Sequence, residues 1–190
     1  AYPGVTLLIL PLMIGEEMGL FKDEGLDVTA VQMRTSIEMQ ALTSGYVDYA
    51  MAAGTGIVAA AKGLEVAVIA VNVNRPPHVL ISLSRFNDVR GLKGQVIGSG
   101  TFGSTYYVTR EVLRTSGLDP DKDIKWLPVG QTPERLQLLS KGLIAATPLS
   151  PPDSILAKKM GFKELVRSSP LVEFPFNGYV TTAKKLRQNP

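Results

Sequence analysis

Hydrophobic positions follow two periods that alternate along the chain. Short runs that alternate apolar with polar residues, or are apolar throughout, predict strands. These runs lie at residues 26–31, 47–51, 65–71, 78–83, 96–98, 124–129, 143–146 and 174–182. Runs with helical spacing lie between them, at residues 11–21, 36–43, 57–62, 104–115, 133–140, 154–160 and from 183 onward. The alternation predicts an α/β fold with mostly parallel sheets flanked by helices.

Both halves of the chain follow one order of elements: strand, helix, strand, helix, strand, polar turn and helix. A polar stretch at residues 72–77 separates the halves, and its consecutive prolines, Pro76 and Pro77, stiffen the chain there. The strand expected at 174–182 leads back toward the first half. We therefore expect two lobes, the first formed by residues 1–78 with 176–190 and the second by residues 79–175.

A strand that ends in glycines and leads into an amphipathic helix is the most informative local pattern. Gly98, Gly100 and Gly103 match the spacing G-x-G-x-x-G, and Ser104 and Thr105 follow in the first helical turn. A dinucleotide site would need an acidic residue at the end of the next strand, which instead runs into glycine and glutamine. The pattern favours a small-ligand site at the backbone N–H groups of the helix start, with a dinucleotide site and a plain turn as alternatives.

Composition and charge exclude several classes of protein. With 190 residues, 45% of them hydrophobic, the chain can bury a sizeable core. The net charge of +3 comes from scattered residues without a basic run, so nucleic acid is not expected as a partner. The absence of cysteine excludes disulfides and thiolate chemistry. A single histidine leaves little general-base chemistry and makes a zinc site improbable, so we expect neither catalysis nor a cofactor or metal.

The ends of the chain point to a processed or trimmed form. No initiating methionine, signal peptide or apolar segment long enough to cross a membrane is found in the sequence. The first residues look like the end of a strand that enters a loop.

Five blocks of residues resemble a known family in the correct order. They are PLMIGEEMGLFKDEGLDV at 11–28, ALTSGYVDYA at 41–50, LKGQVIG at 92–98, GLDPDKDI at 117–124 and LSPP at 149–152. The chain resembles the solute-binding proteins of nitrate, sulfonate and taurine type ABC importers, a group that also includes thiamine-precursor binders. The resemblance covers nearly the whole chain.

The resemblance implies a two-lobed fold of the periplasmic binding protein type II class. Such proteins close around a small-molecule ligand and present it to an ABC permease at the membrane, so a periplasmic or a lipid-anchored extracellular location is expected. Family members continue past Pro190 with helices that pack on the first lobe. The first lobe is therefore expected to be incomplete at its C-terminus, and the bare apolar face could drive formation of a homodimer.

The predicted ligand-binding residues come from the loops and helix starts of both lobes. They are Leu10, Pro11, Gly54, Thr55, Asn74, Arg75, Gly103, Ser104, Thr105, Ser150, Pro151 and Tyr179. The resemblance assigns the first wall of the cleft to the loop at Leu10, and helix starts to Gly54 and Gly103. Because one helix start contributes at most about 2 kcal/mol to an anion, and micromolar affinity needs about 8 kcal/mol, the two helix starts are expected to face each other across one cleft.

Other chemically distinctive residues have structural explanations. His78 borders an apolar strand and is expected to be a structural hydrogen-bonding residue. Arg75 either neutralises an anionic ligand or pairs with a surface carboxylate. Asp119, Asp121 and Asp123 alternate as in a calcium loop, but no glycine follows at the sixth position, so a solvated loop is expected.

Two other functions stay open at this stage. The chain could be an enzyme on the same fold, of the thiamine-precursor or menaquinone biosynthesis type, or the effector domain of a transcription regulator. The ligand cannot be identified from the sequence, because few charged residues fall at the predicted cleft positions.

Overall fold

The computed structural model describes residues 1–4, 6–130 and 132–188, apart from the side chain of Ser36. The chain divides into two compact units. Unit 1 comprises Ala1–Asn74 and Pro175–Pro190, and unit 2 comprises Arg75–Phe174. The chain therefore leaves unit 1 and returns to it, so that its first and last parts share one unit.

Unit 2 is built on a mixed five-stranded sheet with the order β4-β3-β5-β2-β6. Its strands are β2 (Val79–Ser82), β3 (Val96–Ser99), β4 (Lys125–Pro128), β5 (Ala146–Leu149) and β6 (Lys163–Arg167). Strand β3 pairs in parallel with β4 and β5, whereas β2 pairs antiparallel with β5 and β6. A short 3-10 helix, η2 (Arg90–Leu92), precedes β3.

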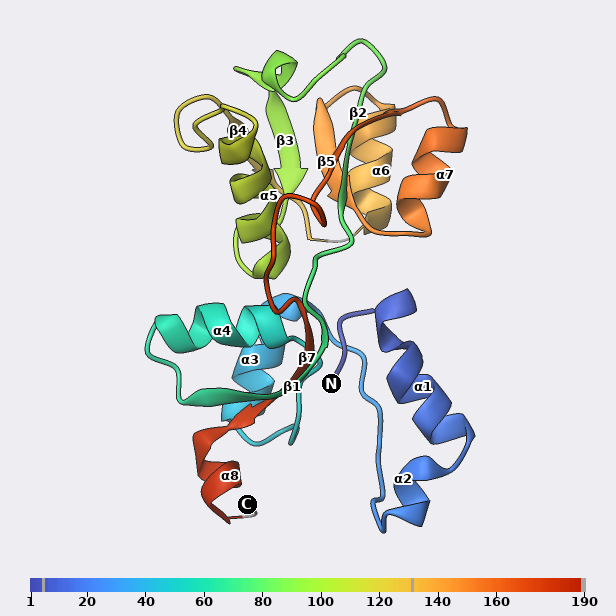
Figure 1. Cartoon of the computed structure of the whole chain (residues 1–190), viewed down its shortest axis with the longest axis vertical. Coiled ribbons are helices and arrows are strands. Elements are labelled where there is room, and N and C mark those ends of the chain that lie inside the picture. The colour runs from blue at the N-terminus through green and yellow to red at the C-terminus, as the bar shows by residue number, and fades with distance from the viewer. Residues whose placement is uncertain (5, 131, 189–190) are drawn as a thin grey trace. The chain divides into compact units, whose positions relative to one another are not determined.

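Helices cover both faces of this sheet (Figure 1). They are α5 (Ser104–Thr115), α6 (Thr132–Ser140) and α7 (Asp153–Lys159). Alternate side chains of a strand point to opposite faces. Leu80 and Ile97 accordingly pack with Leu113 of α5, whereas Ile81 packs with Leu139 of α6 and with α7. The helix α5 thus covers one face of the sheet, and α6 and α7 cover the other.

Unit 1 contains a two-stranded antiparallel sheet, β1 (Val66–Val73) with β7 (Asn177–Thr182). Its helices are η1 (Leu7–Ile9), α1 (Leu10–Glu17), α2 (Leu20–Asp23), α3 (Thr35–Thr43), α4 (Ala53–Ala61) and α8 (Ala183–Gln188). Helix α4 lies close against β7 because Gly56 has no side chain. A Cβ atom there would lie only 2.6 Å from the Cγ2 atom of Val180.

The structure confirms the α/β class and most of the expected elements, including the helix at 104–115. The expected mostly parallel pairing is limited to β4, β3 and β5, so that the sheet of unit 2 is mixed and the sheet of unit 1 is antiparallel. The helix expected at 11–21 is divided into α1 and α2 at Gly19, whose φ of 72° lies in the left-handed region.

Two expected strands are wrong. Residues 26–31 and 47–51 form no strand, and near them only the isolated bridges Tyr2–Gln32 and Ala50–Val180 pair the backbone. An alternating pattern makes a strand only where a neighbouring strand can pair along its length. Strand β5 begins at Ala146, later than expected, and β6 was not expected at all.

Candidate functional site

The start of α5 is an open helix end. Strand β3 ends at Ser99, and Gly103 occupies the position before the helix with a φ of 94°, which favours glycine. Gly103 has no side chain to cap the helix, and no other side chain among the described residues bonds the first N–H groups. The first turn of a helix has no intrahelical partners for these groups, so α5 presents backbone donors at the carboxyl end of β3.

His78 connects this helix start to the end of β5. Its Nε2 atom lies 3.1 Å from the Oγ1 of Thr105, and its Nδ1 atom lies 2.8 Å from the Oγ of Ser150. Its backbone N–H donates to the Oγ of Ser168, 3.1 Å away, whose own hydroxyl lies 2.6 Å from the carbonyl oxygen of Pro76. The imidazole therefore holds two hydroxyls that come from different parts of unit 2.

The imidazole of His78 is neutral at ordinary pH. Burial, together with a smaller effect of the positive charge of Arg135, lowers its pKa from 6.5 to about 3. A neutral imidazole has one N–H donor and one nitrogen acceptor. Consequently one of the two hydroxyls, on Thr105 or on Ser150, receives a hydrogen bond from the ring and the other donates one to it.

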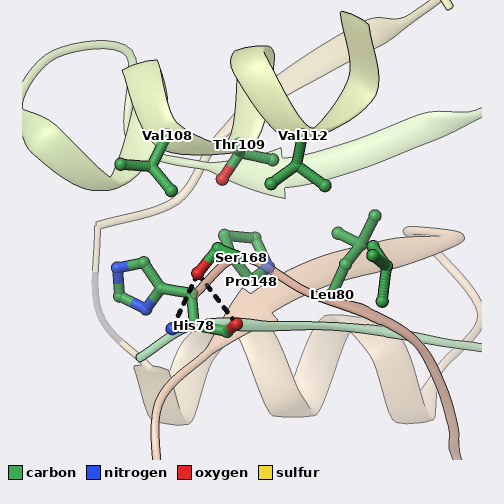
Figure 2. Close-up of a pocket in the computed structure, with 8 residues that line it drawn as sticks. His78, Leu80, Val108, Thr109, Val112, Pro148 and Ser168 are labelled. Carbon is green, nitrogen blue, oxygen red and sulfur yellow. Dashed lines mark hydrogen bonds between the residues drawn. The ribbon is translucent and has the colours of Figure 1, made fainter. Parts of the chain in front are cut away.

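The cavity beneath α5 is too small for a solute. Figure 2 shows Val108, Thr109 and Val112 projecting from α5 toward Pro148 and Ser168. The cavity measures about 10 Å³, which is room for about one water molecule. It is a packing space next to His78, and the candidate binding site is the start of α5, where Thr105 and Ser150 are half-buried.

Arg135, on α6, is a positive charge near this site that the sequence analysis did not single out. Its Nη1 donates to the carbonyl oxygen of Pro148 at 2.8 Å, and its Nη2 donates to the Oγ1 of Thr132 at 3.1 Å. Its Nε atom is buried without a hydrogen-bond partner. Burial lowers the pKa of Arg135, and the charges of Asp153 and Glu134 oppose that shift.

Ser99 contributes a buried hydroxyl on the same face of the sheet as α5. Side chains two residues apart on a strand share a face, and Ile97 packs against α5. The hydroxyl of Ser99 is buried and has no hydrogen-bond partner among the described residues.

Five of the predicted ligand-binding residues lie together in unit 2. They are Gly103, Ser104, Thr105, Ser150 and Pro151. Arg75 also belongs to unit 2, but its guanidinium pairs with the carboxylate of Glu173 at 3.1 Å and donates to the carbonyl oxygen of Ser169. Of the two roles considered for Arg75, the structure shows the pairing with a surface carboxylate.

The other predicted ligand-binding residues belong to unit 1. Leu10 and Pro11 are exposed in the first turn of α1. Gly54 and Thr55 are buried in the first turn of α4, where the N–H of Gly54 donates to the carbonyl oxygen of Phe176 at 3.1 Å. That N–H is therefore already used within unit 1.

Asn74 and Tyr179 lie on different parts of unit 1. Asn74 is exposed just after β1. Tyr179, on β7, is half-buried, which raises its pKa, and its side chain is hydrogen-bonded to Asn72.

The three aspartates expected in a solvated loop make ion pairs with basic side chains. Asp119 pairs with Lys122, Asp121 with Arg110 and Asp123 with Lys93. Within the described part of the chain, no group of three or more histidine or acidic residues is placed to hold a metal ion. Residues 1–4, 6–130 and 132–188 also contain no helix with the length and apolar character needed to cross a membrane.

Sequence reasoning missed Arg135 and Ser99 because neither stands out locally. A signal for Arg135 was present, since it lies early in a helix that follows a strand and a glycine, as Ser104 and Thr105 do. This pattern predicts that Arg135 lies where a strand ends. It does not indicate whether the guanidinium has a hydrogen-bond or ion-pair partner.

Solved structures with the same fold include bacterial sulfonate-binding proteins. A protein of Bordetella bronchiseptica RB50 matches with a TM-score of 0.84 and 24% identity over 100% of this chain and 64% of that chain. The alkanesulfonate-binding protein SsuA of Xanthomonas axonopodis pv. citri, bound to MOPS, matches with a TM-score of 0.79 and 18% identity over 98% and 65%. The periplasmic aliphatic sulphonate binding protein SsuA of Escherichia coli matches with a TM-score of 0.77 and 19% identity over 94% and 59%.

The chain thus spans less than two thirds of the length of these proteins. No protein with a curated description is significantly similar in sequence. A family model described as NMT1/THI5 like matches residues 8–190, and this confirms the resemblance seen in the sequence blocks. The chain belongs to the NMT1/THI5-like family.

Proposed function

We propose that this protein is the solute-binding component of an ABC importer and captures a small anionic or polar organic molecule. The observation that carries the proposal is the open start of α5, with the hydroxyls of Thr105 and Ser150 held beside it by His78. Helix starts of this kind bind anionic and strongly polar groups. Two proteins of the same fold bind sulfonates according to their descriptions.

The proposed ligand contacts are the predicted residues of both units other than Arg75, together with Arg135. A helix start contributes at most about 2 kcal/mol to a partly buried anion, and a charge-assisted hydrogen bond about 1.5–3 kcal/mol. Micromolar affinity requires about 8 kcal/mol, so several such contacts are needed at once. Gly54 and Thr55 of unit 1 are retained as proposed contacts on the family resemblance, and substitution of Thr55 tests them.

We also propose that the protein binds its ligand without transforming it. The contact between Ser150 and His78 has the distance of a nucleophile–base pair. A general base works best when its pKa lies near the working pH, whereas burial lowers that of His78 to about 3. The second ring nitrogen contacts Thr105 in place of the carboxylate that orients the histidine of a catalytic triad.

Native mass spectrometry of the purified protein tests the proposal first, because a binding protein carries its solute unchanged. A compound released in altered form would support a biosynthetic enzyme. A helix-turn-helix encoded upstream of Ala1 would support the effector domain of a regulator, and a signal peptide there would support periplasmic or lipid-anchored extracellular location.

Paired substitutions then test the site itself. The double variant Thr105→Ala, Ser150→Ala should weaken binding of the co-purified solute about 10- to 100-fold, since it removes two polar contacts. Thr115→Ala is the matched control, because Thr115 is exposed at the other end of the same helix. Equal affinity of the double variant and the control would remove the start of α5 from the site.

The proposed partners are an ABC permease and a second copy of the chain. Reconstitution with a candidate ABC permease from the same genome tests the first partner, and ligand-stimulated ATP hydrolysis is the expected result. Light scattering tests pairing of two copies, and a monomer at high concentration would exclude it.

A further inference from the structure

Arg135 is a half-buried cation without a carboxylate in ion-pair contact. Within the described residues it makes no ion pair, although Arg75, Arg110, Arg114 and Arg167 all do. Its Nε–H is buried and donates to no acceptor among the described residues. The negative charges of Asp153 and Glu134 act on Arg135, but neither carboxylate forms an ion pair with it. Burying part of a charged group without a paired counter-charge is costly. An anion that arrives from solution would offset that cost.

Two hydrogen bonds hold the guanidinium in place. The carbonyl oxygen of Pro148 and the hydroxyl of Thr132 each take one N–H, at 2.8 and 3.1 Å. A guanidinium has five N–H donors in a planar fork, so the Nε–H and two further N–H groups are not used by these bonds. Such a fork is suited to the paired oxygens of a carboxylate or a sulfonate.

The groups around Arg135 limit the charge of the ligand. Pro148 lies two residues before Ser150 in the sequence, and the Arg135 charge acts directly on the imidazole of His78. Because His78 is neutral, it adds no second positive charge and leaves only one of the hydroxyls of Thr105 and Ser150 free to donate outward. The backbone N–H groups of α5 are uncharged, and the negative charges of Asp153 and Glu134 also act on Arg135. One fixed cation in such surroundings matches a group of charge −1 better than a dianion.

We infer that Arg135 binds the anionic group of the solute, and that this group is a monoanionic oxyanion, a carboxylate or a sulfonate. The inference rests on the proposed function, because it places the anion at the same open start of α5. It adds a residue from α6 that determines the charge of the ligand.

Matched pairs of charged and uncharged probes test the inference by calorimetry. The anions are methanesulfonate, MOPS and acetate, and the uncharged counterparts are dimethyl sulfone and acetamide. All titrations are made at pH 8, where MOPS is mainly the monoanion and inorganic phosphate, added for comparison, is mainly the dianion. Each probe is titrated into the wild-type protein, Arg135→Gln, Arg135→Lys and Arg114→Gln. Arg114 is an exposed arginine of α5 whose substitution changes the net charge by the same amount.

The wild type should bind at least one monoanion more than tenfold tighter than its uncharged counterpart and tighter than phosphate. Arg135→Gln should lose about 10- to 100-fold in affinity for that monoanion and keep its affinity for the uncharged probe. Arg135→Lys should recover part of the loss, and Arg114→Gln should behave as the wild type. If Arg135 only stabilised the structure, Arg135→Gln would bind charged and uncharged probes more weakly to the same extent.

Three results would overturn the inference. They are equal binding of charged and uncharged probes by the wild type, equal losses for both in Arg135→Gln, and no binding of any anion. If the inference about Arg135 fails but native mass spectrometry finds a co-purified neutral solute, the proposed function as a solute-binding protein is still supported. If Arg135→Gln does not fold, the comparison of charged with uncharged probes in the wild type and in Arg135→Lys decides.

Discussion

Glu38, on α3, should make unit 1 less stable as the pH rises. Its side chain is completely buried, and neither carboxylate oxygen has a hydrogen-bond partner among the described residues. Burial raises its pKa from 4.5 to about 7, against a smaller opposite effect of the N-terminal ammonium group of Ala1. The protonated, uncharged form of Glu38 is therefore the one that fits the folded state.

The sign and size of the effect follow from proton linkage. Below pH 4.5 Glu38 is protonated in both the folded and the unfolded state. Between pH 4.5 and about 7 only the folded state retains the proton, so the free energy of unfolding falls as the pH rises. At 1.36 kcal/mol for each unit of pKa difference, the total loss is about 3 kcal/mol, and it is complete above about pH 7.

The variant Glu38→Gln removes this titration and nearly keeps the shape of the side chain. The difference in unfolding free energy, variant minus wild type, should therefore increase by about 3 kcal/mol between pH 4.5 and pH 8. The buried amide of the variant also lacks hydrogen-bond partners, which lowers its free energy of unfolding by about 1–3 kcal/mol at every pH. This cost does not change how the difference depends on pH.

Urea unfolding followed by circular dichroism at several pH values measures this difference. The fluorescence of Trp126, the single tryptophan, reports unit 2 separately. Glu17→Gln is the control, because Glu17 is exposed on α1 in the same unit. Parallel pH profiles of the wild type and Glu38→Gln would refute the argument, since they would mean that Glu38 ionises equally in both states.

Three further predictions concern packing and the histidine network. Gly56→Ala should destabilise unit 1 by about 1–3 kcal/mol, because its Cβ would lie 2.6 Å from the side chain of Val180; Gly130→Ala, with open space around it, should cost far less in the same thermal or urea unfolding assay. Ser168→Ala should lower the free energy of unfolding by about 1–3 kcal/mol, since the buried backbone N–H of His78 loses its partner; an unchanged urea midpoint would contradict this. Long-range ¹H–¹⁵N spectra should show a neutral imidazole at pH 5, and stability should fall as the pH drops from 6.5 toward 3, where the unfolded state binds a proton that folded His78 does not; a charged ring at pH 5 would contradict both.

The helices and strands whose formation depends on residues close together in the sequence were predictable from the sequence. The helix α5 and the strand before it follow from apolar periodicity and from the glycines that end the strand. Blocks of residues such as 11–28 indicated the family, because their order along the chain is specific. The hydroxyls of Thr105 and Ser150 were therefore found as candidates before their positions were known.

Only the tertiary structure decided which of these groups meet, because pairing depends on residues far apart in the sequence. Strand β1 pairs with β7 across more than a hundred residues, and the alternating run at 26–31 forms no strand for lack of such a neighbour. His78 reaches Thr105 and Ser150 only because the sheet brings three distant segments to one end. That Arg135 forms no ion pair among the described residues is likewise a property of its folded surroundings, which the sequence does not contain.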